Sequence, residues 1–344
     1  MRVFSGIQPT GRKHLGNYIG AIRQYVESQE RAQAAGGDSI FCIVDLHATT
    51  VPYDPAELRE RVYDTAAILL AAGLDPERCI LFRQGDVVEH TELMWLLTAV
   101  TAHGDLNRMT QFKDKSAQQR ELVSAGLFLY PVLMAADVLA YKATEVPVGE
   151  DQRQHLELMR DVAQRFNARF AGDREVLVVP EARIPEVGAR IMDLQEPTRK
   201  MSTTSGTDEG RVYVLDEAKV VEKKLKRAVT DSEDPPRIVH DRGAKPGVSN
   251  LLELLAVARG TSIDEVVASL ADARGYGDLK KATADAVVEL LTPVRERYGA
   301  IRADEDALED VLAAGAAKAR AIAAQTLAEV RALMGVGPNV RARA

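Results

Sequence analysis

A glycine-rich turn between a short apolar run and an amphipathic helix opens the chain, within residues 4–21. The helix is predicted to begin near Asn17, because apolar residues then recur at helical spacing. A strand, a glycine-rich loop and a helix in this order direct free backbone N–H groups and the positive end of the helix toward a phosphate. A tight turn whose glycines serve only packing would leave the same pattern. The residues concerned are Gly6, Pro9, Gly11 and Gly16 in the turn, His14-Leu15-Gly16-Asn17 at the helix start, and Ile19, Ile22, Tyr25 and Val26 on the apolar side.

The residues after the turn exclude two common phosphate-binding motifs. Gly11 and Gly16 have the spacing of a P-loop, but Asn17 and Tyr18 replace its Lys-Ser/Thr pair. The G-x-G-x-x-G fingerprint of dinucleotide-binding folds is absent as well. A nucleotide bound at this turn must therefore be held by a different set of residues.

Composition narrows the class of protein further. With 344 residues, 46% hydrophobic and 28% charged, the chain is ordinary for a globular protein of about two domains. No run reaches the ~20 apolar residues of a membrane helix, and no basic and apolar leader precedes the first strand, so we expect a cytoplasmic protein. Cys42 and Cys79, the two cysteines, lie in apolar runs and are too few for a cysteine-held metal cluster. The net charge of -7 argues against non-specific coating of nucleic acid but not against a local basic patch.

The first hundred residues alternate short apolar strands with amphipathic helices. Strands are predicted over residues 39–45 and 79–83, and helices over 55–73 and 91–102, with a loop over 45–49. This alternation favours a parallel α/β sheet, in which ligands bind beyond the carboxyl ends of the strands. The glycine-rich turn and His47 both fall on that edge.

The rest of the chain predicts a helical stretch, a lid and a second, all-α domain. Residues 105–175 are largely helical in pattern, a further strand is predicted over 175–179, and the polar stretch 183–209 is interpreted as a loop or lid. We place a domain boundary between residues 207 and 208. The helices predicted beyond it cover residues 217–229, 249–259, 262–273, 279–298 and 305–333.

An aspartate stands in an otherwise apolar helical stretch. Tyr130, Met134, Asp137 and Tyr141 are spaced by four, three and four residues and so share one face. Asp137 either is a core residue satisfied by a backbone group or an arginine, or forms the acidic floor of a ligand pocket.

Two further segments carry chemistry-bearing residues. In the run Val146 to His155, the residues Glu150, Asp151 and Gln152 begin a helix; they suit a helix N-terminus electrostatically, and they also suit sugar hydroxyls or a substrate ammonium. The stretch from Pro197 to Gly206 is cationic and rich in hydroxyls, and it can be a simple basic linker or a lid that closes over phosphates.

In combination, these segments resemble the class I aminoacyl-tRNA synthetases, and among them the bacterial tryptophanyl-tRNA synthetases. The resemblance spans nearly the whole chain, and the order of its motifs is what makes it specific. The matching segments are Ser5-Gly6-Ile7-Gln8-Pro9-Thr10-Gly11 with His14-Leu15-Gly16-Asn17, the run Met109 to Ser116, Tyr130-Pro131 through Asp137, the run Pro147 to Gln152, Lys200-Met201-Ser202, Ala228 to Ser232, and Lys245 to Leu252.

The resemblance implies a Rossmann-like catalytic domain over residues 1–207, whose helical connecting segment 105–150 contributes to a homodimer contact, and an α-helical tRNA-binding domain over 208–344. It implies that Asp137 accepts the indole N–H of tryptophan, with Gln152 and Tyr130 at the ammonium group. The implied tryptophan-binding residues are Asp137, Phe4, His47, Tyr130, Met134, Val146, Val148 and Gln152. The implied ATP-binding residues are Gln8, Pro9, Thr10, Gly16, Asn17, Gly149, Glu150, Asp151, Ile191, Lys200, Met201, Ser202, Thr203 and Thr204.

The implied reaction is attack of the tryptophan carboxylate on the ATP α-phosphate, followed by transfer of the acyl group to tRNA(Trp). Magnesium is bound through the ATP phosphates, with no metal held by the protein itself. Catalysis is expected from positioning and charge, with Lys200, Lys115, Gln8 and Asn17 as the catalytic residues. One departure from the family pattern is Thr203, which replaces the second lysine of Lys-Met-Ser-Lys-Ser. Restoring lysine there is expected to change turnover more than tryptophan affinity.

A dense basic cluster is predicted on the helix over 217–229, and it would contact tRNA phosphates or form a solvated helix face. Its members are Lys223, Lys224, Lys226 and Arg227. Three alternative functions remain open at this point: a tyrosyl-tRNA synthetase, a tRNA-independent amino-acid adenylating paralogue or accessory binding protein, and a simple nucleotidyltransferase.

Overall fold

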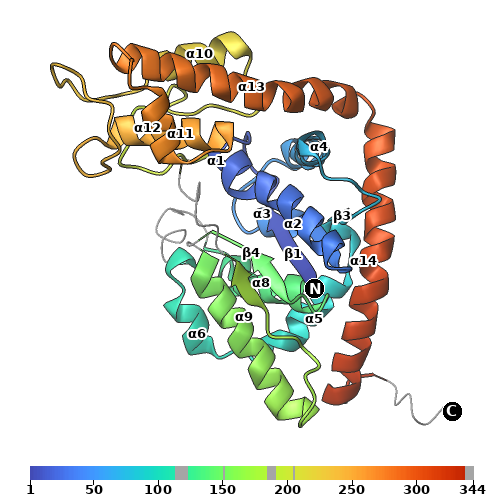
Figure 1. Cartoon of the computed structure of the whole chain (residues 1–344). Helices are drawn as coiled ribbons and strands as arrows, with labels where there is room; N and C mark the ends of the chain where they lie inside the picture. The colour runs from blue at the N-terminus through green and yellow to red at the C-terminus, as the bar shows by residue number, and fades with distance from the viewer. Residues whose placement is uncertain (113–122, 150–151, 184–190, 204–205, 338–344) are drawn as a thin grey trace.

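A five-stranded parallel sheet forms the centre of the chain, in the order β3-β2-β1-β4-β5. The computed structural model describes residues 1–344 except 113–122, 150–151, 184–190, 204–205 and 338–344 (Figure 1). The strands predicted over 39–45 and 79–83 are confirmed, and so is the parallel α/β class. The strands are β1 (Arg2–Ile7), β2 (Asp38–Ile43), β3 (Ile80–Arg83), β4 (Glu145–Pro147) and β5 (Glu181–Arg183).

Strand β2 shows why the sheet lies in the interior. Phe41 and Ile43 point into one apolar core and Ile40 and Cys42 into the other, and all four are fully buried. Such a strand, apolar on both faces, is typical of a parallel sheet that helices cover on both sides. The covering helices in the first half of the chain are α2 (Arg23–Ala34) and α4 (Pro55–Ala72) for one core, and α5 (Glu89–Thr98), α8 (Ala125–Leu139) and α9 (Arg153–Phe166) for the other.

Helix α4 follows the sequence signals closely. Asp54 is its N-cap and accepts a hydrogen bond from the Glu57 N–H at 2.8 Å, Pro55 is its first residue, and Gly73 ends it. The helix predicted over 91–102 is present as α5, which begins two residues earlier and ends four residues earlier. The remaining short elements of this half are α1 (Leu15–Asn17), the π-helical turns η1 (Tyr18–Ile22) and η4 (Asn167–Ala171), α3 (Asp45–Ala48), η2 (Gln84–Asp86) and α6 (His103–Arg108).

Two local predictions are wrong. Residues 45–49 are not a plain loop, because they contain the helical turn α3. No strand forms over 175–179; instead, Oδ1 of Asn167 accepts the N–H groups of Val176 and Leu177 at 3.1 and 3.0 Å. The Asn167 amide also donates to the Leu177 carbonyl at 2.7 Å, so a side chain satisfies the backbone that a sheet partner would have bonded.

Beyond residue 217, the described part of the chain contains helices and no strand, as predicted. These helices are α10 (Ala218–Lys226), α11 (Pro246–Arg259), α12 (Ile263–Ser269), α13 (Tyr276–Arg302) and α14 (Glu305–Met334). No helix among the described residues combines the length and the apolarity needed to span a bilayer.

Helix α14 belongs by its packing to the first half of the chain. It runs along the side of the sheet, next to β3 and α5 (Figure 1). A Cβ added at Gly315 would overlap the carbonyl oxygen of Leu81 in β3, so the two backbones touch. Ala316, Ala319 and Ala323 continue this close face. The boundary between residues 207 and 208 stays a prediction, but α14 covers the sheet rather than lying with α10 to α13.

Candidate active site at the carboxyl edge of the sheet

One cavity of about 310 Å³ opens at the carboxyl edge of the sheet, between β1, β4 and α8. All eight residues implied as tryptophan-binding line it: Phe4, His47, Tyr130, Met134, Asp137, Val146, Val148 and Gln152. Gln8 and Gly149, two of the implied ATP-binding residues, line the same cavity. Segments far apart in the sequence therefore meet at the edge where ligands bind in parallel sheets.

Asp137 lies on the wall of this cavity with an exposed fraction of only 2%. Its Oδ1 is 2.7 Å from both Nδ1 of His90 and Nε2 of Gln84, and its Oδ2 is 2.8 Å from Nε2 of His47. Burial alone would raise the pKa of Asp137, but the hydrogen bonds and charges of His47 and His90 hold that pKa well below its usual range. Asp137 is therefore an ionised carboxylate whose orientation three side chains fix.

These contacts leave one acceptor position on Oδ2. A carboxylate offers about four lone-pair positions, and the described residues occupy two on Oδ1 and one on Oδ2. The partners are two imidazoles and an amide, and not the arginine or backbone group that the core interpretation of Asp137 expects. A buried carboxylate in this state can bind one more donor from inside the cavity.

Tyr141 does not share the cavity with the other members of its predicted face. It is fully buried behind the cavity, stacked on Phe4 with ring centroids 5.4 Å apart. Its hydroxyl is 2.6 Å from Nε2 of His90. Nδ1 of His90 donates to Asp137 and Nε2 of the same ring bonds the Tyr141 hydroxyl, and burial keeps the pKa of Tyr141 well above its usual value.

Tyr130 crosses another side of the cavity. Its hydroxyl lies 2.8 Å from Nε2 of His155 and 3.4 Å from Oε1 of Gln111, and burial raises its pKa to about 12. His155, Gln84 and His90 were not among the residues expected in the site. A signal for His90 was available, since an imidazole within the apolar run of α5 requires a buried partner.

The glycine-rich turn that leads into α1 is called the signature turn below. His14, the N-cap of α1, makes the hydrogen bonds that shape its end. Nδ1 of His14 accepts the Asn17 N–H at 3.2 Å, and Oδ1 of Asn17 accepts the His14 N–H at 3.1 Å, which forms a capping box. Burial, together with the positive charges of Arg211, Lys13 and Lys200, lowers the pKa of His14 to about 4. The imidazole is therefore neutral near pH 7 and lies among three cationic side chains.

Gly16 lies beside this imidazole, and Ile191 lies beside Gly16. A Cβ added at Gly16 would come within 3.0 Å of the His14 ring and 3.6 Å of Cβ of Ile191. Three of the implied ATP-binding residues, Gly16, Asn17 and Ile191, are thus brought together around His14.

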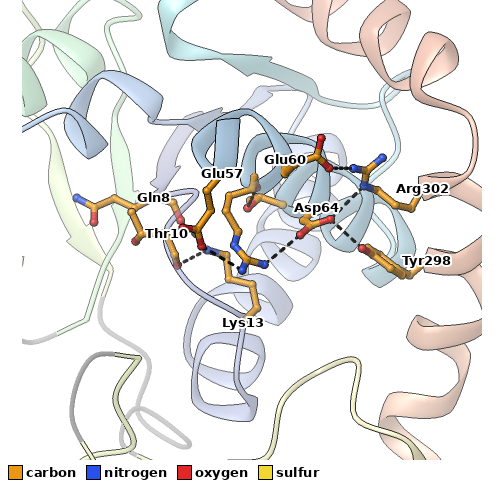
Figure 2. Close-up of polar contacts among 10 residues, drawn as sticks. Gln8, Thr10, Lys13, Glu57, Glu60, Asp64, Tyr298 and Arg302 are labelled. Atoms are coloured by element: carbon orange, nitrogen blue, oxygen red, sulfur yellow. Dashed lines mark hydrogen bonds and ion pairs between the residues drawn. The ribbon is translucent and has the colours of Figure 1, made fainter. Parts of the chain in front are cut away.

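Lys13 holds the turn from beneath. Its ammonium donates to the carbonyls of Gln8 and Thr10 at 2.6 and 3.3 Å, as Figure 2 shows. Burial, followed by the charge of Arg61, lowers the pKa of Lys13 to about 8. Beyond Lys13, Asp64 of α4 binds Tyr298 and Arg302 of α13 at 2.9 and 3.0 Å (Figure 2). Lys13 and Asp64 line the same small pocket, so α4 and α13 are joined by polar contacts close to the turn.

The predicted lid runs back to the signature turn. The Met201 N–H donates to the Ile191 carbonyl at 2.9 Å, and Met192 pairs with Lys200 in a short antiparallel bridge. The buried amide of Asn250 in α11 bonds both the N–H and the carbonyl of Met192 at 3.1 Å. These two bonds connect the Met192–Lys200 bridge to the helical part of the molecule, α10 to α13.

The methyl group of Thr203 fills the space beside Gly11, so the lid and the turn are in contact. Gly11 has a positive φ of 59°, a conformation that favours glycine.

Part of the implied set lies outside the described residues, namely Lys115, Glu150, Asp151 and Thr204. Among the described residues, no group of three or more His, Cys, Asp or Glu side chains is arranged to hold a metal ion. The basic cluster divides: Lys223, Lys226 and Arg227 are exposed, but Lys224 is buried. Lys224 pairs with Asp216 at 2.9 Å, and its charge is therefore already neutralised inside the protein.

Comparisons with known proteins agree with this arrangement. The family described as tRNA synthetases class I (W and Y) matches residues 1–292. A tryptophan--tRNA ligase 2 of Streptomyces avermitilis is 50% identical over 339 residues, which covers 98% of this chain and 97% of the relative. A tryptophan--tRNA ligase of Caldanaerobacter subterraneus is also 50% identical, over 335 residues covering 97% and 98% of the two chains.

Solved structures agree as well. The tryptophanyl-tRNA synthetase of Mycoplasma pneumoniae has a TM-score of 0.87 at 36% identity and covers 98% of both chains. That of Campylobacter jejuni, solved with ADP and tryptophan, has a TM-score of 0.80 at 32% identity over 98% of this chain and 100% of its own. The chain therefore belongs to the class I aminoacyl-tRNA synthetases, in the family of the tryptophan and tyrosine enzymes.

Proposed function

We propose that this enzyme activates L-tryptophan in the cavity at the sheet edge and transfers it to tRNA(Trp). The chain is a tryptophan--tRNA ligase by its relatives at 50% identity over nearly its full length. The observation that carries the proposal for the cavity is the ionised Asp137, held by His47, His90 and Gln84 with one acceptor position left on Oδ2.

The indole N–H of tryptophan is a donor without acceptor capacity, and Oδ2 of Asp137 is its partner in this proposal. Phenylalanine would leave the carboxylate without that donor, and sites built this way reject such analogues by about 10⁴–10⁵. Phe4, Met134, Val146 and Val148 supply the apolar walls. Tyr130 and Gln152 face the ammonium group of tryptophan in this proposal. His47 orients the carboxylate of Asp137 from the cavity side.

ATP binds next to this cavity, along the signature turn. The neutral His14 with its capping box orients Gly16 and Asn17, while Lys13 fixes the carbonyls of Gln8 and Thr10. Pro9, Gly149 and Ile191, the residues from Lys200 to Thr204, and Glu150 and Asp151 complete the ATP site in this proposal. Mg²⁺ enters with ATP as part of the substrate and is bound through its phosphates.

The reaction follows from this placement. A carboxylate oxygen of tryptophan attacks the α-phosphorus, the bond from that phosphorus to the bridging oxygen breaks, and the electron pair leaves with pyrophosphate. A ribose hydroxyl of the tRNA terminus then attacks the acyl carbon and releases AMP. Catalysis comes from positioning and from charge near the phosphates, where we place Lys200 and Lys115.

The proposed tRNA contacts are Lys223, Lys226 and Arg227, which are exposed at the end of α10. We also propose a homodimer in the cytoplasm, formed around the connecting segment 105–150. Trp95 and Val88 support that interface, because they are 71% and 58% exposed on and beside α5, close to this segment in sequence. They are seven residues apart and therefore close to the same side of the helix, and contiguous exposed apolar surface marks association sites.

The test is amino-acid-dependent ATP–pyrophosphate exchange, followed by charging of purified tRNA(Trp). Exchange with tryptophan and not with tyrosine or phenylalanine is expected, and Asp137→Asn should reduce tryptophan-dependent exchange by about 10². Asp86→Asn, which changes a carboxylate outside the cavity, is the matched control. Exchange with tyrosine would favour the tyrosyl enzyme, and exchange without charging would favour a tRNA-independent adenylating enzyme.

A further inference from the structure

Arg211 is a partly buried cation at the ATP site for which the proposed function gives no role. It follows the lid in sequence and packs beneath it, with most of its surface covered. Of the three charges that lower the pKa of His14, that of Arg211 has the largest effect, ahead of Lys13 and Lys200. The contacts agree, because the guanidinium donates to the hydroxyl of Tyr213, which is the bridge partner of His14.

The guanidinium is fixed by the lid itself. Nη1 donates to the Thr203 carbonyl at 3.2 Å and to the Tyr213 hydroxyl at 3.3 Å, and Nη2 donates to the Gly206 carbonyl at 2.6 Å. Thr203 in turn packs on Gly11 of the signature turn. Arg211 is thus held between the two loops that enclose the proposed phosphate site.

Its donors are not all used. A guanidinium has five N–H donors, and the three hydrogen bonds to Thr203, Tyr213 and Gly206 use three of them. Nε of Arg211 is buried and has no hydrogen-bond partner among the described residues. The other donor left is the second N–H of Nη2, which has no partner among the described residues and can meet a charged acceptor on a ligand. The neighbouring cation Lys13 is already bonded to two carbonyls.

We propose that Arg211 binds the ATP phosphates and stabilises the negative charge that develops on the departing pyrophosphate. This inference rests on the proposed ATP site. When the α-phosphorus bond to the bridging oxygen breaks, the electron pair moves onto that oxygen, and the guanidinium lies where it can neutralise the charge. No proton or further reactant is needed. The uncharged Thr203 leaves that task to a side chain from outside the lid.

The experiment compares Arg211→Ala and Arg211→Lys with the wild-type enzyme in ATP–pyrophosphate exchange. Arg211→Ala should lower kcat by about 10²–10³, as removal of one transition-state donor does elsewhere, while the tryptophan Kd stays within about twofold. Binding of ATP alone, measured by calorimetry, should weaken about tenfold or more, because a charge-assisted hydrogen bond is removed. Arg211→Lys should retain part of both, because it keeps the charge.

A second substitution separates charge from structural support. Thr203→Lys in the Arg211→Ala background should restore kcat at least about tenfold, because it returns a cation to the lid. Arg237→Ala removes the same charge from the surface of the helical part, where Arg237 pairs with Glu233, and is the matched control. Thermal unfolding of every variant identifies any that fails to fold.

An unchanged ATP affinity and kcat in folded Arg211→Ala would overturn the inference. So would an equal loss of tryptophan and ATP affinity, or an absence of any rescue by Thr203→Lys. If the wild-type enzyme shows no tryptophan-dependent exchange, the proposed function fails instead, and the calorimetric comparison of ATP binding still decides the role of Arg211.

Discussion

Nδ1 of His90 lies 2.7 Å from Oδ1 of Asp137, and Nε2 of the same ring lies 2.6 Å from the Tyr141 hydroxyl. One imidazole thus connects the acidic wall of the cavity to the core behind it. The carboxylate is oriented from the inside of the protein, while its other oxygen faces His47 and the cavity.

His90→Leu should destabilise the protein by about 1–3 kcal/mol, because it removes a hydrogen-bond partner from the buried carboxylate of Asp137 and one from the Tyr141 hydroxyl. The tryptophan Kd should rise as well, since Asp137 loses one of the groups that orient it. His103→Leu alters an exposed histidine of α6 and should leave both quantities unchanged. Urea unfolding and tryptophan titration measure the two effects; an unchanged unfolding free energy would contradict this account of His90.

The pH dependence of stability should show the titration of His14. Its pKa is lowered from 6.5 to about 4 in the folded state, so protons bind the unfolded chain preferentially between these values. Stability is therefore complete above about pH 6.5 and falls as the pH drops toward 4, by up to about 3 kcal/mol from this group. His14→Asn keeps an N-cap acceptor and removes the titration, so its unfolding free energy should fall less steeply over this range. Parallel curves for the two proteins would exclude the effect.

Because of Lys13, kcat/KM for ATP should decrease at alkaline pH. Its pKa is lowered to about 8, so the ammonium that holds the Gln8 and Thr10 carbonyls loses its proton as the pH rises past 8. We expect kcat/KM for ATP to decrease there in the wild type. Lys13→Met should be about tenfold lower at pH 7 and should lack this decrease, because one charged hydrogen bond is worth about 1.5–3 kcal/mol. Lys318→Met, which also removes a lysine bonded to a backbone carbonyl, should keep it.

The contact between Gly315 and Leu81 predicts opposite effects for two Gly→Ala substitutions in adjacent helices. Gly315→Ala should destabilise the protein by about 1–3 kcal/mol or more, because the added Cβ overlaps the β3 backbone. Gly299→Ala in α13 meets nothing within 4 Å and should stabilise the helix by up to about 1 kcal/mol. Thermal unfolding compares the two, and equal changes would show that α14 does not pack this closely.

Lys224 should behave differently from its exposed neighbours. Lys224→Met leaves the buried carboxylate of Asp216 with Arg12 and the Tyr213 N–H as partners and should cost about 3 kcal/mol or more of stability. Lys223→Ala and Lys226→Ala should change stability by less than about 0.5 kcal/mol. They should also reduce the salt slope of tRNA binding by about 0.7–0.9 for each tRNA phosphate that the removed ammonium neutralised. Unfolding and salt-dependent tRNA binding of the three variants test this division.

The elements that the sequence predicted well are those determined by neighbours in the chain. Helix α4 has its cap, its first-turn proline and its terminal glycine all within or beside its own residues. Strands β2 and β3 contain the continuous apolar runs Ile40 to Ile43 and Ile80 to Phe82. The apolar run at 176–177 looked the same, but the amide of Asn167 took the hydrogen bonds that define a strand. Nothing in residues 175–179 themselves carries that information.

The site was predicted in its composition but not in its connections. The cavity gathers the implied residues, yet Asp137 is held by side chains from α3, η2 and α5, which no local pattern relates to α8. Lys224 looked like part of a surface cluster because its partner Asp216 lies before α10 begins. The spacing of residues within a helix does not reveal an ion pair with a residue outside it. The role that we propose for Arg211 was hidden for the same reason, since carbonyls of the preceding loop hold its guanidinium and no local pattern shows this.

The amide of Asn250 has a mechanical consequence. It bonds both the N–H and the carbonyl of Met192. Met192 in turn pairs with Lys200 in the antiparallel bridge. If α11 moved while Met192 stayed in place, both hydrogen bonds would break together. Each buried group left unsatisfied would cost about 1–3 kcal/mol. Rotation of helices α10 to α13 and displacement of Lys200, the proposed catalytic lysine, are therefore mechanically coupled.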